Sequence, residues 1–340
     1  MSYQLCMICV IINKKVLIMK KIAIIFFSLL LFFSFIKAEN LIAKKKVFYI
    51  NSYHSGLYWS DGIEKSIKET LLKSKIPIEF KRVEMNSKRN NNEPYKMKIA
   101  QKIKNQIENF KPDVIITSDD NAIKYVIEPY FKNSSIPIVF CGINGTIKKY
   151  KELPFNITGM EEVQLIPQLI DALKKYAKGN RIGSLDDDSF SAKAQSDFFE
   201  EQLKRKIYKK HARTIDEWKK YYVYLQNNTD ILLLGNSGAL INWDKNKENL
   251  EDFVKEETKI PTAAWDITVS KFVVLTFANN PEEQGRWAAN AVLRILKGED
   301  IKNIPIAINE KANIYINTTL SKKLNIVFPF ELIDNAVLVK

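Results

Sequence analysis

The chain has 340 residues, 46% of them apolar, and carries a formal charge of +13. This length and apolar content allow one large domain or two of ordinary size. There is no heptad run and no internal repeat of about 20–50 residues, which excludes coiled coils and solenoids. The lysines are interspersed with glutamates, and there is no arginine-rich stripe, so nucleic-acid binding is not expected.

The first 38 residues are expected to be a leader rather than part of the fold. From Met19, two lysines precede an apolar run from Ile22 to Ile36, and Ala38 is a small residue at a plausible cleavage position. This layout is typical of a secretory signal peptide, with Met19 as the expected initiator. The run has 15 residues, whereas a membrane span needs about 20, so an uncleaved anchor is the alternative. The mature chain is then expected to be periplasmic.

From Lys46 onward, short β-branched runs alternate with helical patterns over short connections. Runs such as VIIT and IPIVF are nearly all apolar, as in parallel strands that are buried on both faces. The expected strands are 47–52, 78–85, 113–118, 136–143, 181–185, 206–213, 230–235, 260–265, 272–277 and 305–317. The expected helices are 61–74, 94–110, 121–132, 163–177, 191–205, 215–226, 247–257 and 281–297.

This pattern predicts an α/β fold of two lobes, each a parallel sheet flanked by helices. The expected N-terminal lobe is 39–157 and the expected C-terminal lobe is 158–340. The division falls at NITGMEE, with Gly159 as a flexible point. The final segment, 318–329, is expected to return to the interface between the lobes as a short helix.

The loop after the first strand, NSYHSGLYWSDGI, gathers unusual side-chain chemistry. Ligand sites in open parallel sheets lie beyond the carboxyl ends of the strands, so this loop is expected at a cleft. Tyr53, Tyr58 and Trp59 offer flat apolar faces for stacking on an organic ligand, and His54 could hydrogen-bond a carboxylate. The alternative is that Trp59 packs against the first helix and Asp61 is its N-terminal acid.

Two further loops follow strands of the first lobe. In SDDNA, Ser118 is expected to cap a helix whose N–H groups could bind an anion. Asp119 and Asp120 could instead bind an ammonium group, or they could complement the helix dipole. In FCGING, Gly142 allows close backbone approach. Other candidate ligand contacts in these loops are Asn121 and Asn144.

Three loops of the second lobe are also candidates. LDDDSFSAKA could hold a metal, but N-capping of a helix by Ser189 or Ser191 is the simpler hypothesis. Trp265 and Asp266 could supply an aromatic wall and a charge partner, or they could serve lobe packing and a helix cap. The remaining candidate contacts here are Ser189, Phe190, Asn236 and Ser237.

Several segments in order resemble one family: IPIVFCGIN, NITGMEE, DILLLGNSGAL and TFANNPEEQGRWAANAVLRILKG, followed by NIPIAINEKANIYINTTLSKKLNIVFP. They are similar to extracytoplasmic substrate-binding proteins of ABC transporters, of the tryptophan/tyrosine-binding type. The resemblance covers nearly all of 46–330. It implies a hinged, two-lobed periplasmic-binding-protein-like fold of type I with a ligand between the lobes. NSYHSGLYWSDGI departs from the transporter branch and looks more like related periplasmic sensor domains.

No enzyme is expected. The chain has no P-loop, GxGxxG, GxSxG or HExxH motif, and its two histidines are His54 and His211. Cys141 is the one cysteine outside the leader, and no Cys-His signature accompanies it. We therefore expect no catalytic residue, no cofactor and no metal.

The sequence thus predicts an exported solute-binding protein that closes on a small organic ligand and serves an ABC permease. The aromatic residues suggest an aromatic amino acid or a similar planar molecule as one hypothesis for the ligand. The alternative function is a periplasmic sensing module that presents its closed state to a membrane sensor kinase or chemoreceptor.

Overall fold

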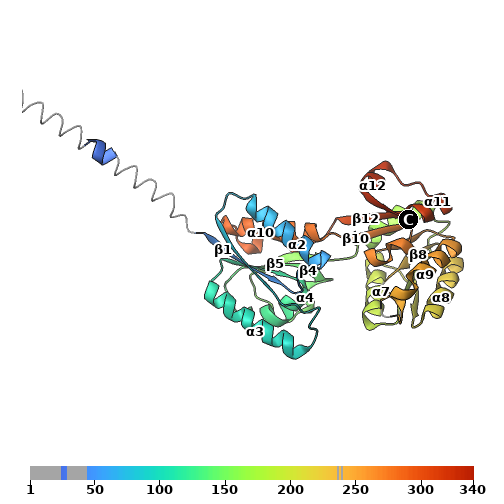
Figure 1. The fold of residues 1–340 in the computed structure, drawn as a ribbon, viewed down its shortest axis with the longest axis horizontal. Coiled ribbons are helices and arrows are strands. Elements are labelled where there is room, and N and C mark those ends of the chain that lie inside the picture. Colours follow the sequence, from blue (N-terminus) through green and yellow to red (C-terminus); the bar gives the residue numbers. More distant parts are fainter. Residues whose placement is uncertain (1–23, 29–43, 236, 239) are drawn as a thin grey trace, which may run out of the picture.

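The protein is described by a computed structural model that covers residues 24–28, 44–235, 237–238 and 240–340. The expected leader therefore lies outside the described residues, apart from a helical stretch at 24–28. From residue 44 onward the chain forms two lobes, each built on one sheet (Figure 1). Within the described ranges, no helix has both the length and the apolar character that a membrane crossing requires.

The N-terminal lobe contains a parallel sheet in the order β11-β5-β4-β3-β1-β2. Its strands are β1 (Lys45–Asn51), β2 (Ile78–Glu84), β3 (Val114–Ser118), β4 (Ile138–Asn144), β5 (Ile157–Glu162) and β11 (Ala307–Ile308). Its main helices are α2 (Tyr58–Leu72), α3 (Glu93–Phe110) and α10 (Pro281–Leu296). The expected helix at 121–132 is α4 (Asp119–Ala122), a π-helical turn (Ile123–Ile127) and α5 (Glu128–Phe131).

Alternation of side chains along β1 explains why helices cover both faces of this sheet. Phe48 and Ile50 point into a core that α3 and the π-helical turn cover. Val47 and Tyr49 point into a second core, which α2 and α10 cover. All four side chains are fully buried, as expected for a central strand of a parallel sheet.

The C-terminal lobe contains a sheet in the order β13-β12-β10-β9-β8-β6-β7. All its neighbours are parallel except the antiparallel pair β10–β12. The strands are β6 (Ile182–Asp187), β7 (Tyr208–Ala212), β8 (Ile231–Leu234), β9 (Thr262–Ala264), β10 (Leu275–Asn279), β12 (Ala312–Asn317) and β13 (Ala336–Val339). The helices include α6 (Ile166–Leu173), α7 (Phe190–Leu203), α8 (Ile215–Asn228), α9 (Trp243–Glu257), α11 (Thr318–Lys323) and α12 (Phe330–Asp334).

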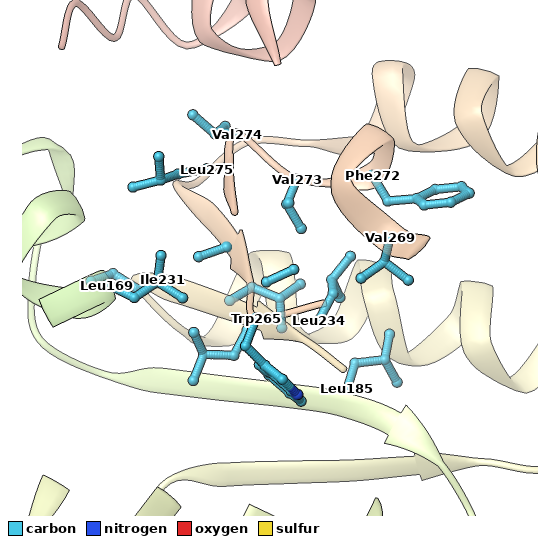
Figure 2. Packing of buried hydrophobic residues seen from close by; sticks show 14 of the residues in the cluster. Leu169, Leu185, Ile231, Leu234, Trp265, Val269, Phe272, Val273, Val274 and Leu275 are labelled. Atoms are coloured by element: carbon cyan, nitrogen blue, oxygen red, sulfur yellow. The ribbon is translucent and has the colours of Figure 1, made fainter. Parts of the chain in front are cut away.

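One continuous hydrophobic cluster fills the C-terminal lobe. Figure 2 shows side chains of β6, β8 and β10 meeting those of the segment that follows β9. Trp265 belongs to this cluster, and its ring meets that of Phe199 edge-on with 4.5 Å between centroids. The aromatic residue that the sequence singles out is therefore partly a core residue, with 8% of its surface exposed.

Within the described residues, the chain passes between the two sheets three times. The first passage follows β5, the second leaves β10 for α10, and the third joins β11 to β12. The expected division assigned 158–340 to the C-terminal lobe, whereas β5, α10 and β11 pack with the N-terminal sheet. The final segment does form a short helix, α11, but its continuation β13 pairs with β12 in the C-terminal sheet.

Gly159 was expected to be a flexible point, but it lies inside β5. A Cβ atom at this position would meet the Phe140 ring at 2.3 Å. Close packing against Phe140, rather than freedom of the backbone, therefore accounts for this glycine.

Helix α10 packs so closely on α2 that Gly285 has no room for a side chain. A Cβ atom at Gly285 would lie 2.2 Å from both the Ile63 carbonyl oxygen and the Ser66 hydroxyl. We expect Gly285→Ala to push the helices apart and to lower the free energy of unfolding by about 1–3 kcal/mol. Urea denaturation measures this change. Arg286→Ala, on the exposed side of the same helix, is the matched control, and equal stability of both variants would contradict the packing argument.

Candidate functional site

A cleft of about 380 Å³ lies between the lobes. The loop after β1, the ends of β3 and β4, and the segment after β9 all contribute side chains to it, as the rule for parallel sheets requires. Its lining residues are Tyr53, Tyr58, Trp59, Lys88, Asp119, Asn144, Glu162, Gln164, Gln195, Trp265, Asp266, Ile267, Ala278, Asn279, Asn313 and Tyr315.

Aromatic side chains reach this cleft from both lobes. Tyr53 and Trp59 come from the N-terminal lobe, and Trp265 and Tyr315 come from the C-terminal lobe. The hydroxyl of Tyr58 accepts a hydrogen bond of 2.9 Å from the Asn313 amide on β12. The cleft therefore has stacking surfaces on two sides and a hydrogen bond that joins its two walls.

Asp119 is the most deeply buried acid of the cleft, with 1% of its surface exposed. Its Oδ1 accepts a hydrogen bond of 2.8 Å from the Trp59 indole Nε1. Its Oδ2 is buried and has no hydrogen-bond partner among the described residues. Burial, followed by the negative charge of Glu162, raises the pKa of Asp119 well above its usual value, although the hydrogen bond from Trp59 acts against the shift.

The backbone around Asp119 has unusual geometry. Asp119 has φ +66°, in the left-handed region that residues with a side chain rarely adopt. Ser118 stands at the N-cap position of α4, but its hydroxyl pairs with the Tyr49 hydroxyl at 3.0 Å and does not cap the helix. Gly142, with φ +67°, lies beside Asp119 and Trp59. A Cβ atom at Gly142 would be 3.2 Å from the Asp119 carboxylate and 3.5 Å from the Trp59 ring.

Glu162 is a second cleft carboxyl, and it lies at the first passage between the lobes. Its Oε1 accepts a hydrogen bond of 2.8 Å from the Asn279 amide at the end of β10. Burial raises the pKa of Glu162 to about 7, although the bond from Asn279 opposes the shift. The charge of Asp120 raises this pKa further, and those of Lys88 and Lys149 lower it.

Asp120 differs from its neighbour Asp119 because it is fully paired. It accepts hydrogen bonds from Lys149 at 2.5 Å, Tyr150 at 2.6 Å and Asn144 at 2.9 Å. Burial acts against ionisation, but these bonds together lower the pKa of Asp120. The Asn144 amide, which lines the cleft, is thus held in place by Asp120.

Local structure accounts for two of the expected sites in the second lobe. Asp266 lines the cleft, but its Oδ1 also accepts hydrogen bonds of 2.8 Å from the Thr268 amide and hydroxyl. Ser189 is the N-cap of α7 and accepts a bond of 3.3 Å from the Ala192 amide. Among the described residues, no group of three or more His, Cys, Asp or Glu side chains could hold a metal ion.

Only some of the residues predicted to contact a ligand lie in the lining of the cleft. Tyr53, Tyr58, Trp59, Asp119, Asn144, Trp265 and Asp266 line the cleft. His54, Ser118, Asn121, Gly142, Ser189 and Ser237 do not line it. His54 Nδ1 contacts the Ser55 carbonyl at 2.9 Å, and Asn121 donates to the Ser87 hydroxyl at 2.8 Å. Phe190 begins α7, but its side chain and the whole of Asn236 lie outside the described part of the chain.

Sequence reasoning missed several lining residues that come from the passages between the lobes. Glu162, Asn279 and Asn313 are the clearest cases, because each lies at or next to a passage. Glu162 was not among the expected ligand contacts, although it lies in the NITGMEE segment where the lobes were expected to divide. The signal that could have identified Glu162 is its position at the carboxyl end of β5, a strand that the sequence pattern did not reveal.

Comparison with protein families identifies one match. The family model described as ABC transporter substrate binding protein matches residues 47–340. No curated protein sequence matches the chain.

Solved structures resemble this fold at low sequence identity. A ligand-free, open substrate binding protein with adhesive properties from Clostridium difficile is 19% identical, with a TM-score of 0.66 over 87% of this chain and 99% of that one. An ABC domain in complex with L-Trp from Streptococcus pneumonia is 14% identical, with a TM-score of 0.53 over 88% and 100%. A periplasmic ribose ABC transporter protein from Conexibacter woesei is 15% identical, with a TM-score of 0.51 over 83% and 95%. The shared fold is that of type I periplasmic binding proteins.

The raised pKa of Glu162 makes a prediction about stability and pH. Its folded pKa of about 7 exceeds the ordinary value of 4.5, so the folded state binds more protons and loses stability as the pH rises between these values. We expect Glu162→Gln to remove this loss, which amounts to roughly 1–2 kcal/mol for a partly screened carboxyl. Urea denaturation from about pH 5 to about pH 8 measures the difference between variant and wild type.

The exposed Glu152 provides the control substitution Glu152→Gln, for which the difference from wild type should not change with pH. Parallel stability curves for wild type and Glu162→Gln would show that Glu162 titrates normally.

Proposed function

Because this chain belongs to the ABC transporter substrate binding protein family, we propose that it captures a small organic molecule in the cleft and delivers it to an ABC permease. The family consists of binding proteins rather than enzymes and is typically extracytoplasmic. The observation that carries the proposal is the cleft itself, to which both lobes contribute aromatic and hydrogen-bonding side chains. A ligand that touches both lobes favours the closed state, because it makes more contacts there than in the open one.

Export fits this function. The lysines, apolar run and small residue between Met19 and Ala38 have the layout of a signal peptide, and we propose that they direct the chain out of the cytoplasm. Sequencing the N-terminus of the protein purified from its own cells tests this step. A mature chain that begins near Glu39 supports cleavage, and an intact leader would favour a membrane anchor.

The sensing function is a second candidate, because the loop that resembles sensor domains supplies Tyr53, Tyr58 and Trp59 to the cleft. Closure would be the same, but the partner would be a membrane sensor kinase or chemoreceptor. Uptake of the identified ligand by cells that lack this protein separates the two functions: lost uptake supports transport, and normal uptake with lost signalling supports sensing.

Ligand binding should raise the melting temperature of the purified protein. A compound at 100 times its dissociation constant adds about 2.7 kcal/mol, which corresponds to roughly 4 °C for a chain of this size. A screen of amino acids, purines, sugars and organic acids, with L-tryptophan among them, is the first measurement. We expect Trp59→Ala and Trp265→Ala to abolish the shift because both rings line the cleft.

Tyr208→Ala removes an exposed aromatic side chain that does not line the cleft and serves as the control. Trp265→Ala also removes a ring that packs on Phe199, so its affinity must be compared at a temperature where the variant is folded. A compound whose binding survives both tryptophan substitutions would place the binding site elsewhere.

A further inference from the structure

The cleft has an excess of acidic over basic side chains. Among the residues that the structure describes, its lining contains three acids, Asp119, Glu162 and Asp266, and one base, Lys88. The Oδ1 of Asp266 already accepts hydrogen bonds from the Thr268 amide and hydroxyl and caps the helical turn there. Lys88 is largely exposed, and its Nζ lies 4.8 Å from the centre of the Tyr53 ring, with no ion pair to another residue of the described ranges. Asp119 and Glu162 therefore face the cleft without a basic partner of their own.

Asp119 is incompletely satisfied. Trp59 occupies its Oδ1, while Oδ2 is buried without a hydrogen bond among the described residues. A buried polar atom without a partner costs about 1–3 kcal/mol, so native proteins keep such atoms mostly where a ligand, ion or water completes them. Asp119 lines the cleft but Oδ2 itself is buried, so a bound molecule reaches this atom when the side chains around it move as the lobes close.

The surroundings of Asp119 hold its carboxylate in one position. The left-handed backbone at Asp119 sets the direction of its side chain, and the hydrogen bond from the Trp59 indole holds Oδ1. Gly142 leaves room for both because it has no side chain. Strained backbone of this kind persists where the surrounding structure enforces it, commonly at binding sites. The carboxylate is thus pre-positioned before a ligand arrives, which lowers the entropic cost of binding.

Resting on the proposed function, we infer that the ligand carries a protonated amine or amidine that hydrogen-bonds Asp119 Oδ2 and lies between Asp119 and Glu162. A cation with N–H groups supplies the donor that Oδ2 lacks, and it offsets the repulsion between the two carboxylates. An aromatic ring beside Asp119, that of Trp59, stabilises a cation further. A quaternary ammonium has no N–H donor, and a sugar has no charge, so neither satisfies the site equally well.

Binding of such a cation is linked to proton release. Glu162 is partly protonated near pH 7 in the empty cleft, and a bound cation favours its ionised form. The groups that face Glu162 are Asp119 and Asp120 from α4, Lys88 from the loop after β2, Lys149 from the turn at 147–149, and Asn279 from β10. An alkyl ammonium has a pKa of about 10 and stays charged, so affinity should rise by about tenfold from pH 6 to pH 8.

Matched pairs of amines and alcohols test the charge of the ligand. The pairs are tryptamine with tryptophol, 2-phenylethylamine with 2-phenylethanol, and putrescine with 1,4-butanediol, to which agmatine and neutral sugars are added. Calorimetry on the full chain measures each affinity. We expect amines to bind more tightly than their alcohols, and the tightest amine to lose about 30-fold or more in affinity in Asp119→Asn.

Glu162→Gln should weaken the same amine by about tenfold and abolish the rise of affinity with pH. Asp171→Asn removes an exposed carboxylate on α6 and is the matched control, for which affinity should be unchanged.

The outcomes separate this inference from the proposed function. If a sugar or alcohol binds, loses affinity in Trp59→Ala and binds Asp119→Asn normally, the inference is overturned while the solute-binding function stands. If no compound of the amine, sugar and acid sets binds, both are overturned.

The ligand-free stability of Asp119→Asn gives a second measurement that needs no ligand. Asparagine keeps an oxygen for the Trp59 indole but removes a buried carboxylate that lies close to Glu162. A residue kept for binding should leave the melting temperature unchanged or raise it when it is replaced. A fall of more than a few degrees would assign Asp119 a structural role and would overturn the inference.

Discussion

Three segments of the described chain cross between the lobes, and hydrogen bonds of asparagine side-chain amides join these segments to one another. These bonds determine how one lobe is placed relative to the other. The Val163 amide donates to Asn309 Oδ1 at 2.7 Å, which joins the first passage to the third. Asn279 joins the second passage to Glu162, and Asn280 donates to Asn313 at 2.7 Å. Side-chain amides can satisfy backbone and carboxylate groups without forming regular structure, so these bonds hold the passages together where no strand or helix joins them.

Most elements of this fold follow from local patterns. The apolar strands and amphipathic helices were predicted close to their observed positions, because buried parallel strands and one-sided helices have distinct periodicities. The return of α10 and β11 to the N-terminal lobe was not predicted, since periodicity gives the buried face of a helix but not the sheet that buries it. The glycine packing of α10 against Ile63 depends on residues more than 200 positions apart.

The same distinction applies to the cleft. Residues after β1, β3 and β9 were predicted because the carboxyl ends of parallel strands share one edge of a sheet. Ser118 and His54 failed to line it because hydroxyl and imidazole groups find local partners, here Tyr49 and the Ser55 carbonyl. Glu162 was missed for another reason: the division between the lobes was expected at NITGMEE, but the sequence pattern did not show that this segment is a strand whose carboxyl end meets the cleft.

Glu162 takes part both in the cleft and in the contacts between the segments that cross from lobe to lobe. One of its oxygens accepts the amide of Asn279, at the end of the strand where the second passage begins, and the residue also lines the cleft. A change in its ionisation alters the strength of that bond, because a charged acceptor makes a stronger hydrogen bond than a neutral one. Ligand charge and lobe orientation therefore act on the same carboxyl. Asp119 is held by Trp59 within the N-terminal lobe. In the binding mode that we infer, it fixes one end of the ligand, and Glu162 transmits the presence of that ligand to the connection between the lobes.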